Sequence, residues 1–443
     1  MPTTTITPIP YNGGTITLKN RADMTYVHMG AGKFVMLYSQ RAPALTYAYV
    51  VNITGLNTAT PAAANGPQFA FPNTNGQVRA WKMAENRILV LLGNDLRVLE
   101  LDGSDNITMR AAALTGYYSA AYLWLNSSGV NNGEINDLGN MIHAHQLRDN
   151  EMQVFRRGNM ATNQMAGATN WFVTKVVFNP TADTLTSSAS ITTMTPPSGQ
   201  NGYTRLQVKD IPNSTDKIVS VVGADNNASY SRMTSTPRIQ DAWVVNDGGL
   251  IVRALDYRTA GLIYSGAITN GTAYAAHFIL PMTATNYLGF VDGASFIRNV
   301  NSTPVAPRTN VAVSDLKGEW TNYNKFLTNG ENTMVNDAIV IDSSHVMMAI
   351  SAPVDPSAAG SSKLAREATS KTNYLRIIKF VESNFVDVSP QTKTYTSVEL
   401  GVALCPDQQN WFHKVDTNCY VFLSKSDTTE GNMQVTIKAI RAA

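Results

Sequence analysis

WFHKVDTNCYVFLSKSDTTEGNMQVTIKAIRAA, the stretch from Trp411 to Ala443, decides the fold. It predicts three strands, Trp411–Val415, Cys419–Ser424 and Met433–Arg441, separated by polar turns. These three strands need a fourth to complete a four-stranded sheet. A candidate for this fourth strand, Gly14–Lys19 (GTITLK), lies near the opposite terminus. We therefore expect Gly14–Lys19 to pair with Met433–Arg441 as the outermost strand of the last sheet.

The same pattern of a strand, a short polar turn and a more apolar strand recurs along the chain at intervals of roughly 50 to 75 residues. The seven units begin at Thr25, Val78, Ile142, Thr204, Ala276, Asp337 and Trp411. The second strand of each unit is the most continuously apolar, as in Ile88–Leu92, which indicates burial on both faces. In a ring of radially packed sheets each blade is covered by two neighbours, so the pattern predicts an all-β, seven-bladed β-propeller.

Further strands complete some units. Third strands are predicted at Leu45–Asn52, Leu96–Leu101, Tyr230–Met233, Ser295–Arg298 and Tyr374–Phe380. Candidate fourth strands are Ala242–Val245 and Tyr118–Leu125. Leu250–Ile268 fits either a fourth strand or part of another blade, so six or eight blades stay open as alternatives. The predicted domains are an extended arm over residues 1–13 and a single propeller over residues 14–443.

Composition excludes several classes of function. The chain has 443 residues, of which 44% are hydrophobic and only 15% charged, against roughly 25% charged in soluble domains. A net charge of +2 without a basic block gives no electrostatic reason to bind nucleic acid. No uninterrupted apolar stretch is long enough to predict a membrane span, and the N-terminus lacks a signal-peptide pattern. Cys405 and Cys419 are expected to be free thiols of a reducing compartment, with a disulfide between them as the alternative.

Histidines are the residues that come closest to a chemical pattern. Five of them fall on predicted first strands, which line the channel of a propeller: His28, His143, His145, His277 and His413. Two of these, His143 and His145, share a strand face and could be two metal ligands. No third ligand stands at a suggestive spacing, so a polar channel lining explains them.

Other motifs give no catalytic site. The sequence Asp102-Gly-Ser-Asp-Asn is similar to the start of a calcium loop, but no Glu stands at its twelfth position, so a hairpin turn is predicted. A glycosidase would need two facing carboxylates; Asp315 with Glu319, or Asp210 with Asp241, could be proposed, as in any chain with many acids. We predict no catalytic residue, no cofactor and no metal site.

Segments outside the repeat supply candidate contacts to partners. The Pro- and Thr-rich N-terminus fits either a frayed end or an arm that lies along another chain, and its prolines favour an unpaired, extended backbone. Lys317–Glu331 gathers aromatic residues in a polar context, and Asp355–Asn373 reads as a long loop with a short helix near Leu364–Thr369. The candidate contact residues are Pro8, Pro10, Tyr11, Trp320, Tyr323, Phe326, Lys363 and Arg366.

Together, the Thr-, Asn- and Ala-rich β-repeats, the few charges and cysteines and the extended arm Met1–Asn12 resemble virion structural proteins of tailed bacteriophages. The resemblance implies a non-enzymatic component of a tail, neck or fibre, made in the host cytoplasm. It would dock by protein–protein contacts to other virion proteins and to copies of itself. The alternative is a carbohydrate-binding or carbohydrate-active propeller that acts on a glycan or receptor at the host cell surface. The low charge and the arm favour assembly.

Overall fold

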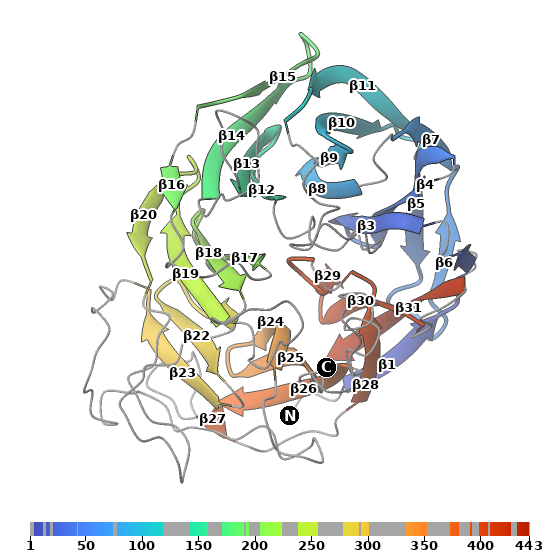
Figure 1. Cartoon of the computed structure of the whole chain (residues 1–443). Coiled ribbons are helices and arrows are strands. Elements are labelled where there is room, and N and C mark those ends of the chain that lie inside the picture. The colour runs from blue at the N-terminus through green and yellow to red at the C-terminus, as the bar shows by residue number, and fades with distance from the viewer. Residues whose placement is uncertain are drawn as a thin grey trace, which may run out of the picture.

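A computed structural model shows the protein as a β-propeller, with its sheets arranged around a central channel (Figure 1). All regular secondary structure is strand in the described residues, which are 4–11, 15–17, 21–41, 43–73, 78–117, 142–157, 171–189, 192–194, 204–223, 238–255, 278–291, 294–300, 334–351, 373–380, 390–391, 398–405, 408–426 and 432–442. Within these ranges no helix is long and apolar enough to cross a membrane.

Five antiparallel sheets follow one another along the chain. The first holds β3 (Arg21–Gly30), β4 (Lys33–Arg41), β5 (Ala44–Thr54), β6 (Ala62–Asn65) and β7 (Phe69–Pro72). The second holds β8 (Val78–Ala84), β9 (Arg87–Leu92), β10 (Asp95–Leu101) and β11 (Ile107–Leu114). The third holds β12 (Ile142–Arg148), β13 (Glu151–Arg157), β14 (Trp171–Asn179), β15 (Thr184–Ser187) and β16 (Thr192–Met194). The fourth holds β17 (Thr204–Asp210), β18 (Lys217–Gly223), β19 (Arg238–Val245) and β20 (Ile251–Ala254). The fifth holds β21 (Phe278–Pro281), β22 (Asn286–Val291) and β23 (Ala294–Asn299).

A ten-stranded sheet takes up the rest of the circumference. It holds β1 (Thr4–Ile9), β2 (Thr15–Thr17), β24 (Met334–Asp342), β25 (His345–Ser351), β26 (Asn373–Phe380), β27 (Pro390–Gln391), β28 (Val398–Ala403), β29 (Phe412–Asp416), β30 (Cys419–Lys425) and β31 (Asn432–Ala442). Strand β28 joins two groups of strands, because it pairs with β26 and also, through Val402 and Ala403, with β30.

The N-terminal segment pairs with the last strand over a greater length than the sequence predicts. Thr15–Thr17 of the predicted strand pairs with β31, opposite Gln434 to Asn432. In addition, β1 pairs antiparallel with β31 over six positions, from Thr4 opposite Ala442 to Ile9 opposite Ile437. The prediction of an unpaired arm over residues 1–13 is therefore wrong for Thr4–Ile9. Pro8 is compatible with this strand because an outermost strand needs only one hydrogen-bonding edge.

One predicted strand needs correction. Ala242–Val245, a candidate fourth strand, lies within β19, the third strand of its sheet. The fourth strand is β20, so the first alternative for the stretch after Leu250 is correct for Ile251–Ala254. The predicted strands Tyr230–Met233 and Tyr118–Leu125 lie outside the described residues, and β11 is the fourth strand of the second sheet.

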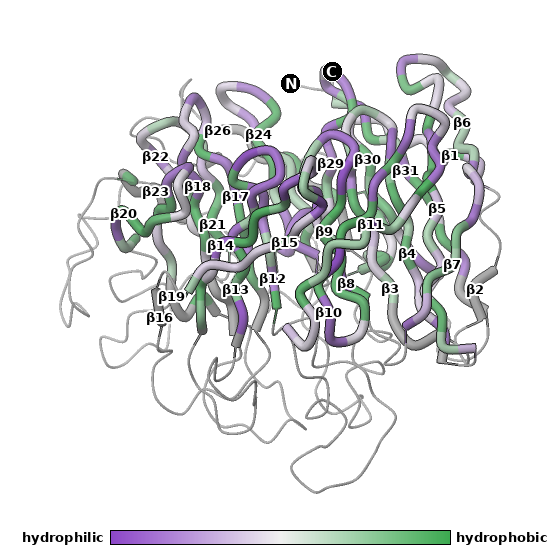
Figure 2. The backbone as a smooth tube through the Cα atoms, turned by 90° about the horizontal axis from the view of Figure 1, so that it is seen from above, coloured by the Kyte–Doolittle hydropathy of each residue, from purple (hydrophilic) through white to green (hydrophobic). Residues whose placement is uncertain are grey.

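The core lies between the sheets rather than within one central mass. Among the described residues, each of seven apolar clusters joins neighbouring groups of strands. Strand β9 shows how this arises, since Leu89 and Leu91 face the third sheet while Ile88 and Val90 face the first. This confirms that the second strands are covered on both faces, and Figure 2 shows apolar residues concentrated along the strands.

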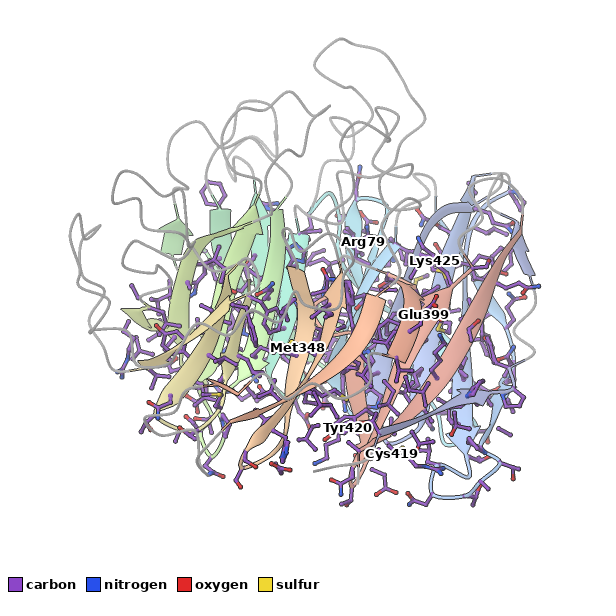
Figure 3. All side chains as sticks on the ribbon, turned by 90° about the horizontal axis from the view of Figure 1, so that it is seen from below. Arg79, Met348, Glu399, Cys419, Tyr420 and Lys425 are labelled. Atoms are coloured by element: carbon purple, nitrogen blue, oxygen red, sulfur yellow. The ribbon has the colours of Figure 1, made fainter. Side chains whose placement is uncertain are left out.

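One cluster brings the two ends of the described chain together. It combines Ile9 of β1 and Ile437 of β31 with Met24, Phe34 and other residues of the first sheet. Side chains fill the space between these ribbons, and Figure 3 shows Cys419 and Lys425 at opposite ends of β30. Cys405 and Cys419 are both buried and free, as the sequence predicts.

The turn between β3 and β4 depends on a close backbone approach. Gly32 accepts a hydrogen bond from the Ile53 backbone N–H at 2.9 Å. A Cβ atom at this position would lie 2.3 Å from the carbonyl oxygen of Ile53. Only glycine permits this contact, which holds the hairpin turn against the end of β5.

Candidate functional site

The central channel contains a cavity of about 540 Å³. Its walls come from the inner strands β3, β8, β12 and β17 and from residues 408–410 and His413, which belong to the last part of the chain (Figure 1). Consecutive residues of these strands line the cavity, as Thr25–His28 do on β3, because each of the four strands is the end member of its sheet. The cavity is the candidate functional site.

A polar segment before β29 crosses the channel and bonds to several sheets. Gln408 Nε2 donates to Thr25 Oγ1 at 2.7 Å and to the Tyr26 carbonyl at 3.0 Å, both on β3. Gln409 Nε2 donates to the Ala144 carbonyl on β12 at 2.9 Å. Asn410 Oδ1 accepts from Lys209 Nζ on β17 at 2.7 Å. We call residues 408–412 the channel segment; it links three inner strands through one short stretch of side chains.

The channel segment is also held by a buried ion pair. Asp337 of β24 is 1% exposed, and its Oδ1 lies 2.6 Å from Lys209 Nζ. Its Oδ2 accepts hydrogen bonds from the backbone N–H groups of Trp411 at 2.6 Å and Phe412 at 2.8 Å. These donors satisfy the carboxylate, so the charge is compensated although it is removed from water. Asp337 therefore serves as an anchor for the segment.

Four of the five predicted channel histidines line the cavity, namely His28, His143, His145 and His413. His277 lies outside the described residues. His145 stacks on Phe155 with ring centroids 5.7 Å apart. His28 and His413 contact each other at 5.1 Å, and His28 Nε2 lies 2.8 Å from the Ala31 carbonyl. The prediction that these histidines form a polar channel lining is confirmed for the four that are described.

Burial lowers the pKa of three of these rings. It lowers the pKa of His145 to about 3, and the nearby Lys217 ammonium acts in the same direction. Burial also lowers the pKa of His28, with a further contribution from Lys82. The pKa of His413 lies well below its usual value because the ring is buried beside His28 and Lys209. Desolvation penalises the charged form of each ring.

The candidate calcium loop is a hairpin turn between β10 and β11, as predicted. The Asp102 carboxylate accepts hydrogen bonds from the backbone N–H groups of Ser104 at 2.8 Å and Asn106 at 2.9 Å. Asp105 turns away and bonds Lys33 of the neighbouring sheet at 2.5 Å. In the part of the chain that the structure describes, no group of three or more His, Cys, Asp or Glu side chains could hold a metal ion.

Of the carboxylate pairs considered for glycoside hydrolysis, only Asp210 with Asp241 falls on described strands, β17 and β19, which are separated by β18 in their sheet. Asp210 stands at the cavity rim, is 79% exposed and pairs with Lys217. Asp241 lies on β19, while Asp315 and Glu319 lie outside the described residues.

The candidate contact residues separate into two groups. Pro8 and Pro10 are exposed, and Tyr11 is half-buried. The Tyr11 hydroxyl donates to the Tyr49 hydroxyl at 3.0 Å, and burial raises the pKa of both phenols. Tyr11 thus attaches the N-terminal segment to the first sheet. The remaining candidates lie outside the described residues: Trp320, Tyr323, Phe326, Lys363 and Arg366.

A further exposed feature lies on the outer side of the fourth sheet. Leu250, Ile251 and Val252 are 55%, 39% and 50% exposed, and Ile251 and Val252 belong to β20. Strand β20 ends the sheet order β17-β18-β19-β20, so within the described residues its outer edge has no strand partner. The sequence signal was present as three consecutive apolar residues after a turn, but their exposure depends on which strand is outermost.

The comparisons with known proteins identify no family. No protein-family model matches the chain, and no curated protein sequence is similar to it. A chain of the S. cerevisiae Core Factor structure is similar in fold with 8% identity and a TM-score of 0.42; the match covers 100% of this chain and 61% of that one. The present chain thus spans about three fifths of that protein's length.

Two other solved structures are similar at the same low level. One is from the S. cerevisiae complex of Dbp5 with Nup159, Gle1, IP6 and ADP, with 9% identity, a TM-score of 0.33, and coverage of 99% of this chain and 95% of that one. The other is the Bombyx mori GH32 beta-fructofuranosidase BmSUC1, with 10% identity, a TM-score of 0.28, and coverage of 97% and 92%.

Proposed function

We propose that this chain is a non-enzymatic structural protein, a rigid propeller that docks to other proteins. The observation that carries the proposal is the exposed apolar edge of β20, formed by Leu250, Ile251 and Val252. Sheet edges in soluble proteins are usually protected by charges, proline or covering segments, since unpaired backbone groups invite another strand. An exposed apolar edge strand is instead suited to a protein partner.

The partner that this edge fits is an extended segment of another protein. Its backbone would continue the hydrogen-bond ladder outward from β20, and its apolar side chains would cover Leu250 and Val252. The pairing of β20 with β19 is irregular at Val252, since Val245 lies opposite Ile251 and Val244 opposite Arg253. All four residues of β20 are exposed, so a paired strand would cover apolar surface that the fourth sheet leaves in contact with solvent.

The assembly that we propose is the virion of a tailed bacteriophage, with the chain placed in the tail, neck or fibre region. The support is the composition: few charges, two buried free cysteines and Thr- and Asn-rich repeats. The exposed Pro8 and Pro10 on the outside of the last sheet offer a second contact, to another virion protein or a second copy.

We also propose that the ring has seven blades and is closed by the N-terminal segment. The ten-stranded sheet would then count as two blades that share β28. Seven inter-sheet clusters in the described residues support this number, and one of them spans the first and last strands. Arg441 supports the closure, since its Nε donates to the Leu56 carbonyl in the first sheet at 3.1 Å. A crystal structure in which β31 does not pack against the first sheet would refute the closure.

The docking proposal is tested by substituting Ile251→Asp in the full chain and measuring its incorporation into particles. We expect reduced incorporation with an unchanged unfolding midpoint, since Ile251 is exposed in the free protein. Thr108→Asp is the matched control, because Thr108 is exposed on β11, the outermost strand of the second sheet. Equal incorporation of both variants would contradict the role of β20, and absence of the chain from purified virions would contradict the assembly itself.

A second proposal is a carbohydrate-binding or carbohydrate-active propeller at the host cell surface. The observation in its favour is that the aromatic residues Tyr26 and Trp81 line the channel cavity together with the carboxylates Asp149 and Asp210. Aromatic faces and carboxylates are the groups that sugar sites use. Binding of the purified chain to host polysaccharide, lost in Asp210→Asn, would favour this function over assembly.

A further inference from the structure

Two histidine rings meet where the channel segment continues into β29. His413 directly follows the segment, and its ring centroid lies 5.1 Å from that of His28 on β3. Phe34 of β4 packs on both rings, with its centroid 4.8 Å from His28 and 5.5 Å from His413. His413 is 9% exposed, whereas His28 is half-buried, and both line the channel cavity. His28 is therefore the ring that a proton from solvent reaches first.

Tyr26 connects this pair of rings to the channel segment. Its hydroxyl lies 3.2 Å from Nε2 of His413 and 3.5 Å from the carbonyl oxygen of Asn410. Its backbone carbonyl accepts a hydrogen bond from Gln408 Nε2 at 3.0 Å. The segment is thus attached to β3 beside the contact between the two rings, so a displacement of His413 from β3 also weakens the attachment of the segment.

The surroundings of the two rings favour their neutral form. The titratable and charged groups that surround the pair are Tyr26 on β3, Lys82 on β8, Lys209 on β17 and Asp337 on β24. Strands β4 and β30 place apolar residues opposite the rings, Phe34 opposite His28 and Val421 opposite His413. The Asp337 carboxylate is already bonded to Lys209 and to two backbone N–H groups of the channel segment, so it does not compensate a new charge on either ring.

His28 takes up its proton on a defined atom. Its Nε2 lies 2.8 Å from the Ala31 carbonyl, and this acceptor places the hydrogen of the neutral ring on Nε2. A proton therefore adds to Nδ1 and produces an imidazolium in contact with His413 and Phe34. A charge that is partly removed from water without a counter-ion costs free energy. Separation of the two rings would let water reach the charge and would remove this cost.

We propose that the contact between His28 and His413 is an acid-sensitive switch, in which protonation of His28 releases the channel segment from β3 and opens the channel. The released state binds the proton more tightly than the closed state, because its rings are in contact with water, so a fall in pH shifts the population toward it. An imidazole in water has a pKa near 6.5, and burial lowers the pKa of His28 in the closed state. The release is therefore absent at pH 7 and grows as the pH falls below about 6.

The switch is tested by hydrogen–deuterium exchange of the full chain, measured by mass spectrometry at pH 7 and pH 4.5 and corrected for the pH dependence of intrinsic exchange. The amides of Trp411 and Phe412 report the channel segment, since they donate to Asp337 in the closed state. We expect their protection to fall by about tenfold or more at pH 4.5, while the amides of β9 keep theirs. An equal loss in β9 would mean that acid unfolds the whole protein, and would contradict a local release.

Three variants identify the group that takes up the proton. His28→Gln cannot be protonated but keeps an N–H donor for the Ala31 carbonyl, so it should retain the protection of the channel segment at pH 4.5. His413→Gln is a second test, since its side-chain oxygen can accept a hydrogen bond from protonated His28, and it should lose less protection than the wild type. His145→Gln is the matched control, because His145 also lines the cavity but stacks on Phe155 of the third sheet, and it should release the segment as the wild type does.

Four results would overturn the proposal: full protection of the wild type at pH 4.5, a loss in His28→Gln equal to that of the wild type, the same equality in His413→Gln, or no release in His145→Gln. An equal loss in His28→Gln would point to protonation of Asp337 instead. Circular dichroism at pH 7 verifies that each variant is folded. The outcome is independent of the docking proposal, because β20 is the outermost strand of the fourth sheet and does not line the cavity.

Discussion

The second sheet and the ten-stranded sheet are built from the chain in opposite ways. The second sheet uses residues 78–114 only, and β8, β9, β10 and β11 pair in chain order. The ten-stranded sheet combines β1 and β2 from the N-terminus with strands from residues 334–442. The first can form by local hairpins, whereas the second must bring together residues more than 400 positions apart, as Thr4 and Ala442 are. Local hairpins are therefore enough for the second sheet, while the ten-stranded sheet depends on pairing between distant parts of the chain.

Deleting residues 1–17 should have the largest effect on the stability of the protein. This removes β1 and β2, exposes the edge of β31 and takes Ile9 out of its cluster. Several ladder hydrogen bonds and one buried Ile side chain are lost, on the order of 5 kcal/mol together, which is comparable to the stability of a whole domain. We expect loss of the cooperative urea transition. Deleting residues 1–3 alone leaves β1 complete and is the control; an unchanged transition in the longer deletion would show that the ends are dispensable.

Asp337→Ala should have the next largest effect. The substitution leaves Lys209, whose side chain is 13% exposed, without its counter-ion, and the Trp411 and Phe412 N–H groups without acceptors. Breaking a buried pair in this way costs about 3–5 kcal/mol. Chemical denaturation measures it, with Asp210→Ala as control, since that exposed pair contributes about 0–1 kcal/mol. Similar costs for the two variants would mean that the channel segment is not held by Asp337.

Leu89→Ala tests whether the second sheet, which forms from local hairpins, unfolds together with the other sheets. Leu89 is fully buried between the second and third sheets, so its truncation should cost about 2–5 kcal/mol through lost burial and a cavity. The loss should appear in one cooperative transition with the rest of the ring, as monitored by tryptophan fluorescence and circular dichroism. Two separate transitions would indicate that the second sheet folds independently of the closing region.

Acidification should destabilise the channel through its histidines. The folded-state pKa of His145 is about 3, below the value near 6.5 of the unfolded chain, so the unfolded state binds more protons between these values. Stability is therefore lost as the pH falls below about 6.5, and His145 contributes about 2 kcal/mol of loss by pH 5. Urea transitions at pH 7 and pH 5 measure the slope of the unfolding free energy against pH, and His145→Gln should reduce this slope. An identical slope in the variant would exclude His145 as the titrating group.

The smallest expected effect concerns Arg441. Its guanidinium donates to the Leu56 and Thr58 carbonyls in the loop after β5, across the junction of the first and last strands. Arg441→Gln should cost about 1–2 kcal/mol in urea denaturation, because hydrogen bonds from a charged donor are lost. Arg97→Gln, which affects only a pair with Asp95 at 3.1 Å inside one hairpin, should cost less. A larger cost for Arg97→Gln than for Arg441→Gln would show that the junction contributes little to the stability of the protein.

The sequence predicts the inner two strands of each unit well because burial on both faces leaves a continuous apolar run, as in Ile88–Leu92. It fails at the sheet edges. Pro8 and Pro10 suggested an unpaired arm, yet Thr4–Ile9 is a strand, because an outermost strand tolerates a residue without an N–H donor.

The candidate site was only half visible in the sequence. The channel histidines were predictable from their place on first strands. The channel segment was not, because Gln408, Gln409 and Asn410 look like an ordinary polar turn. Their roles depend on partners in β3, β12 and β17, which are distant in sequence.

The channel segment has a consequence for how the protein is made on the ribosome. Its partners in β3 are synthesised almost 400 residues before Phe412. At about 5–20 residues per second, the interval is roughly 20 to 80 seconds. Until Gln408 and Gln409 emerge, the early blades lack the side chains that donate to the carbonyls of Tyr26 and Ala144 in the folded protein, so we expect the nascent chain to bind chaperones before its last blade is made.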